Sequence, residues 1–145
     1  MTHGIDTDFL VAVEIRDHPF HQHADALVNH LLEGNHAFAL APQTLAEFIH
    51  VVTDPRRMPI PLLVEDAVAR AEYWWQADAV VRVFPEGVAA ECFLTWLRKY
   101  RLGRKRLLDT MLAATFFQSG IRRVITNNEA DYRVFGVFEI VGYRG

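Results

Sequence analysis

The chain has 145 residues, of which 51% are hydrophobic and 23% charged, so we expect one folded domain over residues 1–145 rather than a disordered chain. The net charge of −3 argues against a protein that coats nucleic acid nonspecifically. Cys92 is the only cysteine, and neither a secretory signal nor a membrane-spanning apolar stretch is recognisable, so we expect a cytoplasmic protein with no membrane contact.

The first half of the chain is predicted to alternate strands with helices. The expected elements are a strand at about 3–5, a helix at about 9–13, a helix at 21–33, a strand at 36–41 and a helix at 42–53. Ala24, Leu27 and Leu31 give the third element its helical spacing, and Gly34 ends it. Pro42 fits the first turn of a helix.

The second half continues this alternation after the proline-rich loop "DPRRMPIP". Its expected elements are helices at about 62–76, 87–102 and 107–119, with strands at 79–84, 122–126 and 137–141. Helices that alternate with strands predict an α/β fold, in which a parallel sheet is covered on both faces.

Polar side chains follow the predicted strands at the points where these strands end. Asp6 follows the first strand, Glu47 lies in the helix after the second, and Asp109 begins a later helix. Asn128 and Asp131 follow the strand at 122–126. Because strand-to-helix turns of a parallel sheet open on one edge, we expect these side chains to converge there.

Converging carboxylates repel one another unless a cation neutralises them. Oxygen ligands without cysteine suit Mg²⁺ or Mn²⁺, and such an ion activates water for phosphodiester hydrolysis. Structural roles are the alternative: Asp6 and Asp109 as helix N-caps, Glu47 as a solvated helix residue and Asp131 as a loop acid. Against this, Glu47 and Asp109 lie among apolar neighbours, where an acid without a partner is costly.

Four segments resemble the signature segments of the PIN-domain family, in the same order and at similar spacing. They are "IDTDFLVA", "LAEF", "LLDTMLAAT" and "VITNNEADY". The length of the chain most resembles the VapC toxins of bacterial toxin–antitoxin pairs. The resemblance implies a three-layer α/β/α domain with a central, mostly parallel sheet of four to five strands. It also implies cleavage of RNA with Mg²⁺ or Mn²⁺.

By this resemblance, Asp6, Glu47 and Asp109 match the three principal acids and would bind the metal. Asn128 stands at a fourth position that is commonly acidic, and Asp131 belongs to the aspartate–aromatic pair that follows it. Asn128 offers oxygen without charge, so we expect one firmly bound ion rather than two. Thr126 is expected to support the site by hydrogen bonding, as its counterpart does in the family.

The resemblance also implies partners. We expect an RNA substrate, a cognate antitoxin that covers the acidic cleft or a nearby groove, and a homodimer. The segment "AEYWWQA" offers aromatic side chains, which are enriched at interfaces.

A basic run, "LRKYRLGRKRLL", precedes Asp109 and is predicted to bind the RNA backbone. Its cations are Arg98, Lys99, Arg101, Arg104, Lys105 and Arg106. The alternative is a solvated helix end with Gly103 just past the last turn.

Other functions are less well supported by the sequence. Asp6 and Asp8 resemble the nucleophile motif of haloacid-dehalogenase-type phosphatases, but the only lysines lie in the basic run and no Asp-Asp pair occurs. Asp8 is then an N-cap or a residue that supports the site. A PIN-like module that binds RNA or protein without cutting remains an alternative. The histidine-rich segment with His18, His21, His23 and His30 has no cysteine nearby, which disfavours zinc.

Overall fold

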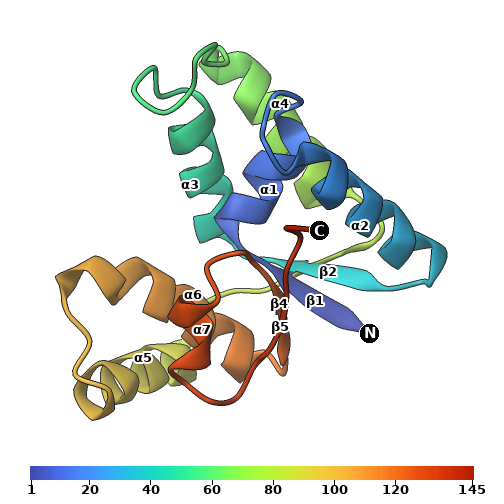
Figure 1. Cartoon of the computed structure of the whole chain (residues 1–145). Helices are drawn as coiled ribbons and strands as arrows, with labels where there is room; N and C mark the ends of the chain where they lie inside the picture. The colour runs from blue at the N-terminus through green and yellow to red at the C-terminus, as the bar shows by residue number, and fades with distance from the viewer.

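A computed structural model describes all residues 1–145 and contains one five-stranded sheet with the order β3-β2-β1-β4-β5. All four strand pairings are parallel, so the sheet predicted to be mostly parallel is entirely parallel. The strands are β1 (Thr2–Ile5), β2 (Ala37–Leu40), β3 (Val80–Arg82), β4 (Arg123–Ile125) and β5 (Glu139–Val141). The first strand of the chain therefore lies in the centre of the sheet (Figure 1).

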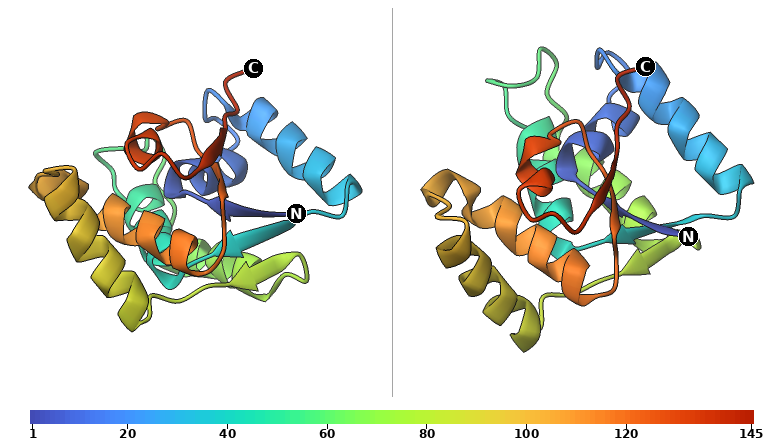
Figure 2. Two further views of the ribbon diagram at one scale, coloured as in Figure 1. Left: turned by 90° about the horizontal axis from the view of Figure 1, so that it is seen from below. Right: turned by 60° about the horizontal axis from the view of Figure 1, so that its bottom comes forward.

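Seven α-helices cover the two faces of this sheet. They are α1 (Thr7–Glu14), α2 (His21–Glu33), α3 (Pro42–Val52), α4 (Val64–Gln76), α5 (Gly87–Lys99), α6 (Leu107–Gln118) and α7 (Ala130–Arg133), and a 3₁₀ turn, η1 (Arg104–Arg106), precedes α6. Helices α1 to α4 pack on one face and α5 to α7 on the other (Figures 1 and 2). No helix is long and apolar enough to span a membrane.

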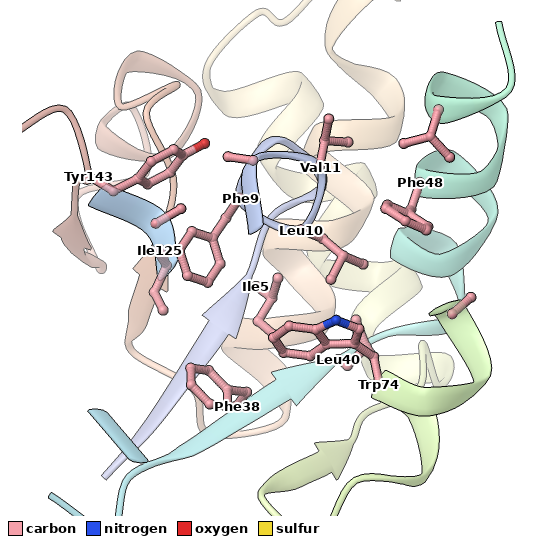
Figure 3. Close-up of a cluster of buried hydrophobic side chains, with 14 of the residues drawn as sticks. Ile5, Phe9, Leu10, Val11, Phe38, Leu40, Phe48, Trp74, Ile125 and Tyr143 are labelled. Carbon is pink, nitrogen blue, oxygen red and sulfur yellow. The ribbon is translucent and has the colours of Figure 1, made fainter. Parts of the chain in front are cut away.

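Alternating side chains of the strands divide the core into two clusters. In β2, Phe38 and Leu40 face the cluster under α1 to α4, which Figure 3 shows, whereas Ala39 faces the cluster under α5 to α7. Gly4 of β1 lies against α6, where an added Cβ would come within 2.9 Å of the Phe116 ring. A glycine at this position therefore lets α6 pack directly on the central strand.

The predicted elements differ from the structure mainly at their ends. Helix α1 begins at Thr7, two residues earlier than expected, directly after Asp6. Helix α5 ends at Lys99 instead of continuing to Leu102, and Arg101, not Gly103, adopts the left-handed conformation with φ of 52°. The four-residue helix α7 was not predicted, so Asp131 lies in a helix rather than in a loop.

Candidate active site

The carboxyl ends of the central strands open onto a pocket of about 340 Å³. Its lining consists of Asp6, Thr7, Asp8, Val11, His18, Glu47, Val51, Arg57, Met58, Asp109 and Asn128. The predicted convergence is therefore observed for Asp6, Glu47, Asp109 and Asn128, which come from four separate segments of the chain.

Asp6 is buried at the junction of β1 and α1, with 6% of its surface exposed. Its Oδ1 accepts a hydrogen bond from the backbone N–H of Thr7 at 2.9 Å, so Asp6 does cap α1. Its Oδ2 accepts from Thr126 Oγ1, also at 2.9 Å. Burial and the neighbouring Asp8 raise the pKa of Asp6, and these two hydrogen bonds offset only part of that effect. Capping and membership of the acidic pocket are thus compatible roles.

Glu47 faces the pocket from the second turn of α3 and is held by neutral donors. Thr7 Oγ1 donates to Oε2 and Gln43 Nε2 donates to Oε1, each at 3.1 Å. Gln43 Nε2 also lies 2.7 Å from the backbone oxygen of Leu108, which links α3 to the first turn of α6. The expectation that Glu47 lacks a compensating partner was therefore wrong, although neither partner carries a charge.

Asp109 lies in the first turn of α6 rather than at the N-cap position. Its pKa is raised to about 6, first by burial and then by the charges of Asp131 and Glu47. Arg106 opposes this shift. The carboxylates of the pocket therefore destabilise one another, and no cation of the chain forms an ion pair with Asp109.

Asp131 does not line this pocket, contrary to the expected convergence. It lies in α7 beside Asp109 and forms an ion pair with Arg106, whose Nε is 3.5 Å from Oδ1. The Arg106 guanidinium also donates to the Asp131 backbone oxygen at 2.6 Å. The helical turn at α7 directs Asp131 towards the η1 side of the pocket, where it forms part of a neighbouring shallow hollow that Asn128 shares.

Asp8 supports the site and is not an N-cap. Its Oδ2 accepts from the backbone N–H of Asn127 at 2.8 Å and from the Tyr143 hydroxyl at 2.7 Å. Thr126 Oγ1 lies between the two aspartates, 2.9 Å from Asp6 Oδ2 and 3.2 Å from Asp8 Oδ1. This hydroxyl in turn accepts from the backbone N–H of Asn128. Thr126 thus contacts Asp6 as its predicted supporting role requires.

The basic run lies outside the pocket lining. Arg106 is engaged with Asp131, and Lys99 Nζ lies 5.2 Å from the centre of the Tyr100 ring. The remaining four cations, Arg98, Arg101, Arg104 and Lys105, are exposed around the α5–η1 turn. This turn leads directly into α6, so the run borders the site on the Asp109 side.

Three residues near the carboxylates were not predicted to contribute to the site. His18 and Arg57 come from the loops that follow α1 and α3, and both line the pocket. Tyr132 is fully buried, its hydroxyl has no hydrogen-bond partner, and Asp6 and Asp109 contribute to raising its pKa. Loop residues have no periodicity, so only the aromatic that follows Asp131 carried a signal in the sequence.

These features define the class of fold. A parallel five-stranded sheet between two helical layers, with an acidic pocket at its carboxyl edge, is the PIN-domain fold, and the chain has this fold in the form found in VapC-type toxins.

Similarity to solved structures supports this assignment of the fold. VapC20 from Mycobacterium tuberculosis, described as a sarcin–ricin loop cleaving toxin, matches with a TM-score of 0.64 and 16% identity over 86% of this chain and 87% of that chain. VapBC2 from Rickettsia felis, bound to a DNA fragment from its promoter, matches with a TM-score of 0.65 and 16% identity over 99% of both chains. VapBC-1 from nontypeable Haemophilus influenzae matches with a TM-score of 0.65 and 16% identity over 100% of both chains. No family model and no curated protein matches the sequence.

Proposed function

We propose that the chain is a metal-dependent endoribonuclease that acts as the toxin of a VapBC-type toxin–antitoxin pair. The observation that supports it best is the pocket that Asp6, Glu47 and Asp109 share, in which none of these carboxylates has an ion-pair partner. The fold is that of VapC toxins, one of which is described as cleaving the sarcin–ricin loop. RNA is therefore the proposed substrate.

The residues of the pocket fit Mg²⁺ or Mn²⁺. The donors are carboxylate oxygens together with the amide of Asn128, which is the ligand type these hard ions prefer. Burial and, after it, repulsion between neighbouring carboxylates raise the pKa values of Asp6 and Asp109, and a divalent cation would relieve that repulsion. No group of three or more acidic, histidine or cysteine side chains is arranged to hold a metal ion by itself. This arrangement suits an ion that keeps several water ligands, and the neutral Asn128 favours one ion over two.

The chain's own residues hold the acids in place before substrate arrives. Thr7 and Thr126 fix both oxygens of Asp6, and Thr7 and Gln43 fix both oxygens of Glu47. Such fixed carboxylates need little reorganisation when a ligand binds. When bound, the metal would supply an activated water and would stabilise a phosphoryl oxygen during hydrolysis of the phosphodiester.

The proposed partners follow from the same likeness. Two of the similar structures are VapBC assemblies, and we extend this to a cognate antitoxin that covers the acidic pocket or a groove near it. We also propose a homodimer. In "AEYWWQA", Tyr73 is 76% exposed whereas Trp74 is buried, so Tyr73 is the aromatic best placed for an interface.

The proposed activity is tested by incubating the purified chain with an RNA pool and Mg²⁺ or Mn²⁺. We expect cleavage that stops with EDTA and in Asp6→Asn, and that persists in Asp25→Asn, which removes an exposed acid of α2. Cleavage that survives both EDTA and Asp6→Asn would overturn the proposal. No cleavage by the wild type under any metal condition would favour the non-catalytic binding module.

The toxin role is tested separately in cells. Induction of the soluble wild-type chain should arrest growth, and Asp6→Asn should not. Co-expression of a protein encoded beside this gene should restore growth if that protein is the antitoxin. Unimpaired growth at high levels of soluble, cleavage-competent protein would contradict the toxin role and leave the nuclease activity standing.

A further inference from the structure

Two loops contribute the only basic side chains that line the acidic pocket. His18 lies in the loop between α1 and α2, and Arg57 lies in the loop between α3 and α4. In Figure 1 the loop after α3 and the α5–η1–α6 region lie on opposite sides of the carboxyl edge of the sheet. The loop that carries Arg57 therefore lies on the side of the sheet edge away from the basic run.

His18 lines the pocket, and its ring is held so that one nitrogen is a hydrogen-bond donor. Its Nδ1 accepts from the backbone N–H of Phe20 at 3.1 Å, so in the neutral ring the proton is on Nε2. The Phe20 ring packs 5.9 Å away, centre to centre, and limits rotation of the imidazole. Nε2 has no partner within the chain, which leaves one oriented N–H on a half-buried side chain in the pocket wall.

Arg57 is a charge without a strong partner. Its closest anion is Asp54, with Nε to Oδ2 at 3.9 Å, and the arginine side chain is 58% exposed. Its terminal guanidinium nitrogens make no hydrogen bond within the chain and are free to form a paired contact with an anion. The adjacent Arg56 lines a different hollow, with His50, Thr53, Asp54 and Pro55, and therefore serves as a matched control.

We propose that His18 and Arg57 form a phosphate-binding subsite for the RNA backbone, on the α3–α4 side of the acidic pocket. The subsite rests on the proposed ribonuclease function. An RNA strand that enters a pocket of carboxylates is repelled, and a guanidinium with an oriented N–H offsets this repulsion for a phosphate beside the scissile one. The basic run on the Asp109 side would contact the strand at the other end, so the strand would cross the pocket between the two.

The test measures affinity for a fluorescent oligouridylate by anisotropy, in EDTA and at several salt concentrations, so that binding is separated from cleavage. Arg57→Gln should weaken binding by about tenfold. It should also make the slope of log affinity against log salt shallower by about 0.7, the value for one phosphate contact with a single strand. Arg56→Gln should leave both affinity and slope close to those of the wild type.

His18 is tested with two substitutions by amide side chains, each of which replaces the function of one ring nitrogen. His18→Asn keeps an acceptor near Nδ1 and loses the donor at Nε2, so it should weaken binding several-fold with no change in the salt slope. His18→Gln places an amide N–H near Nε2 and should bind nearly as well as the wild type. His30→Gln, at an exposed position of α2, controls for loss of an imidazole.

The same variants are then assayed for RNA cleavage, which separates this subsite from the proposed function. An Arg57→Gln that behaves like Arg56→Gln in both affinity and salt slope overturns the subsite, even if the wild type cleaves RNA. Loss of binding in His18→Gln with retention in His18→Asn would show that the histidine only shapes its loop, and this also overturns it. Salt-dependent binding lost in Arg57→Gln, with no cleavage by the wild type, would keep the subsite and reject the nuclease.

Discussion

The hydroxyl of Tyr143 donates a hydrogen bond to Oδ2 of Asp8 at 2.7 Å, across 135 positions of the sequence. Asp8 lines the acidic pocket and shares Thr126 with Asp6. The segment after β5 is thereby connected to the first helix of the chain. The centre of the Tyr143 ring lies 5.1 Å from the centre of the Phe9 ring in the core (Figure 3).

Tyr143→Phe removes this hydrogen bond and keeps the ring. We expect the free energy of unfolding to fall by about 1 to 2 kcal/mol, because a partly buried hydrogen bond is lost and Asp8 keeps only one of its two donors to Oδ2. RNA cleavage should fall mainly through kcat, since Thr126 and Asp6 lose their fixed neighbour. Tyr73→Phe, at an exposed position, should change neither quantity. Equal stability of Tyr143→Phe and the wild type in urea denaturation would contradict this prediction.

Asp109→Asn should stabilise the chain in EDTA near pH 7.5. The pKa of Asp109 is raised from 3.8 to about 6, so the folded state holds its proton more tightly than the unfolded state does. The resulting destabilisation grows between these two pH values and is complete above pH 6. We expect a gain of about 1 to 2 kcal/mol, reduced from the full shift because the side chain is partly exposed to solvent.

This gain should shrink as the pH falls from 6 and should disappear below about pH 4, where the carboxyl is protonated in both the folded and the unfolded chain. Excess Mg²⁺ should raise the Tm of the wild type more than that of Asp109→Asn, because the variant lacks a charged ligand. A variant that is less stable than the wild type at both pH values would show that the carboxylate has a structural role that outweighs the repulsion.

His3 makes the fold sensitive to mild acid. Burial lowers its pKa from 6.5 to about 4, and the neighbouring His36 and Arg123 add to the shift. The unfolded chain takes up this proton below pH 6.5, whereas the folded chain does not until about pH 4. Neutral His3 therefore contributes fully to the free energy of unfolding above pH 6.5, and this contribution is lost as the pH falls from 6.5 to 4. The loss has an upper bound of about 3 kcal/mol.

His3→Gln should flatten the dependence of the free energy of unfolding on pH between pH 4 and 6.5. His30→Gln, which changes an exposed imidazole, should leave that slope as it is in the wild type. An unchanged slope in His3→Gln, measured by urea denaturation across this range, would mean that carboxylates alone set the acid sensitivity.

The basic run is predicted to contact RNA, and its cations differ in their contacts: Arg106 is paired with Asp131, whereas Arg104 and Lys105 are exposed. Arg104→Gln with Lys105→Gln changes exposed charges only and should weaken RNA binding and reduce its salt dependence. Arg106→Gln also removes the partner of Asp131 and the cation that lowers the pKa of Asp109, so it should alter metal affinity as well. Binding by the double variant with the salt slope of the wild type would place the RNA path elsewhere.

Much of the fold could be predicted because the decisive signals are local. The helical spacing of Ala24, Leu27 and Leu31 matches α2 over His21–Glu33, and strand ends followed by acids placed Asp6, Glu47 and Asp109 at one edge. The end of α5 was not predictable from Gly103, because Arg101 adopts the left-handed conformation earlier in the chain. His18, Arg57 and Tyr143 belong to loops and a terminal segment, whose positions depend on tertiary packing.

The central place of β1 also affects the order of events during synthesis. The first strand leaves the ribosome early, but its neighbour β4 and the hydroxyl that holds Asp6 come from residues about 120 positions later. At roughly 5 to 20 residues per second, translation needs on the order of ten seconds to bridge that interval. Throughout it the acids of the pocket remain on separate parts of an unfinished chain, so the pocket cannot assemble until almost all of the chain has been made.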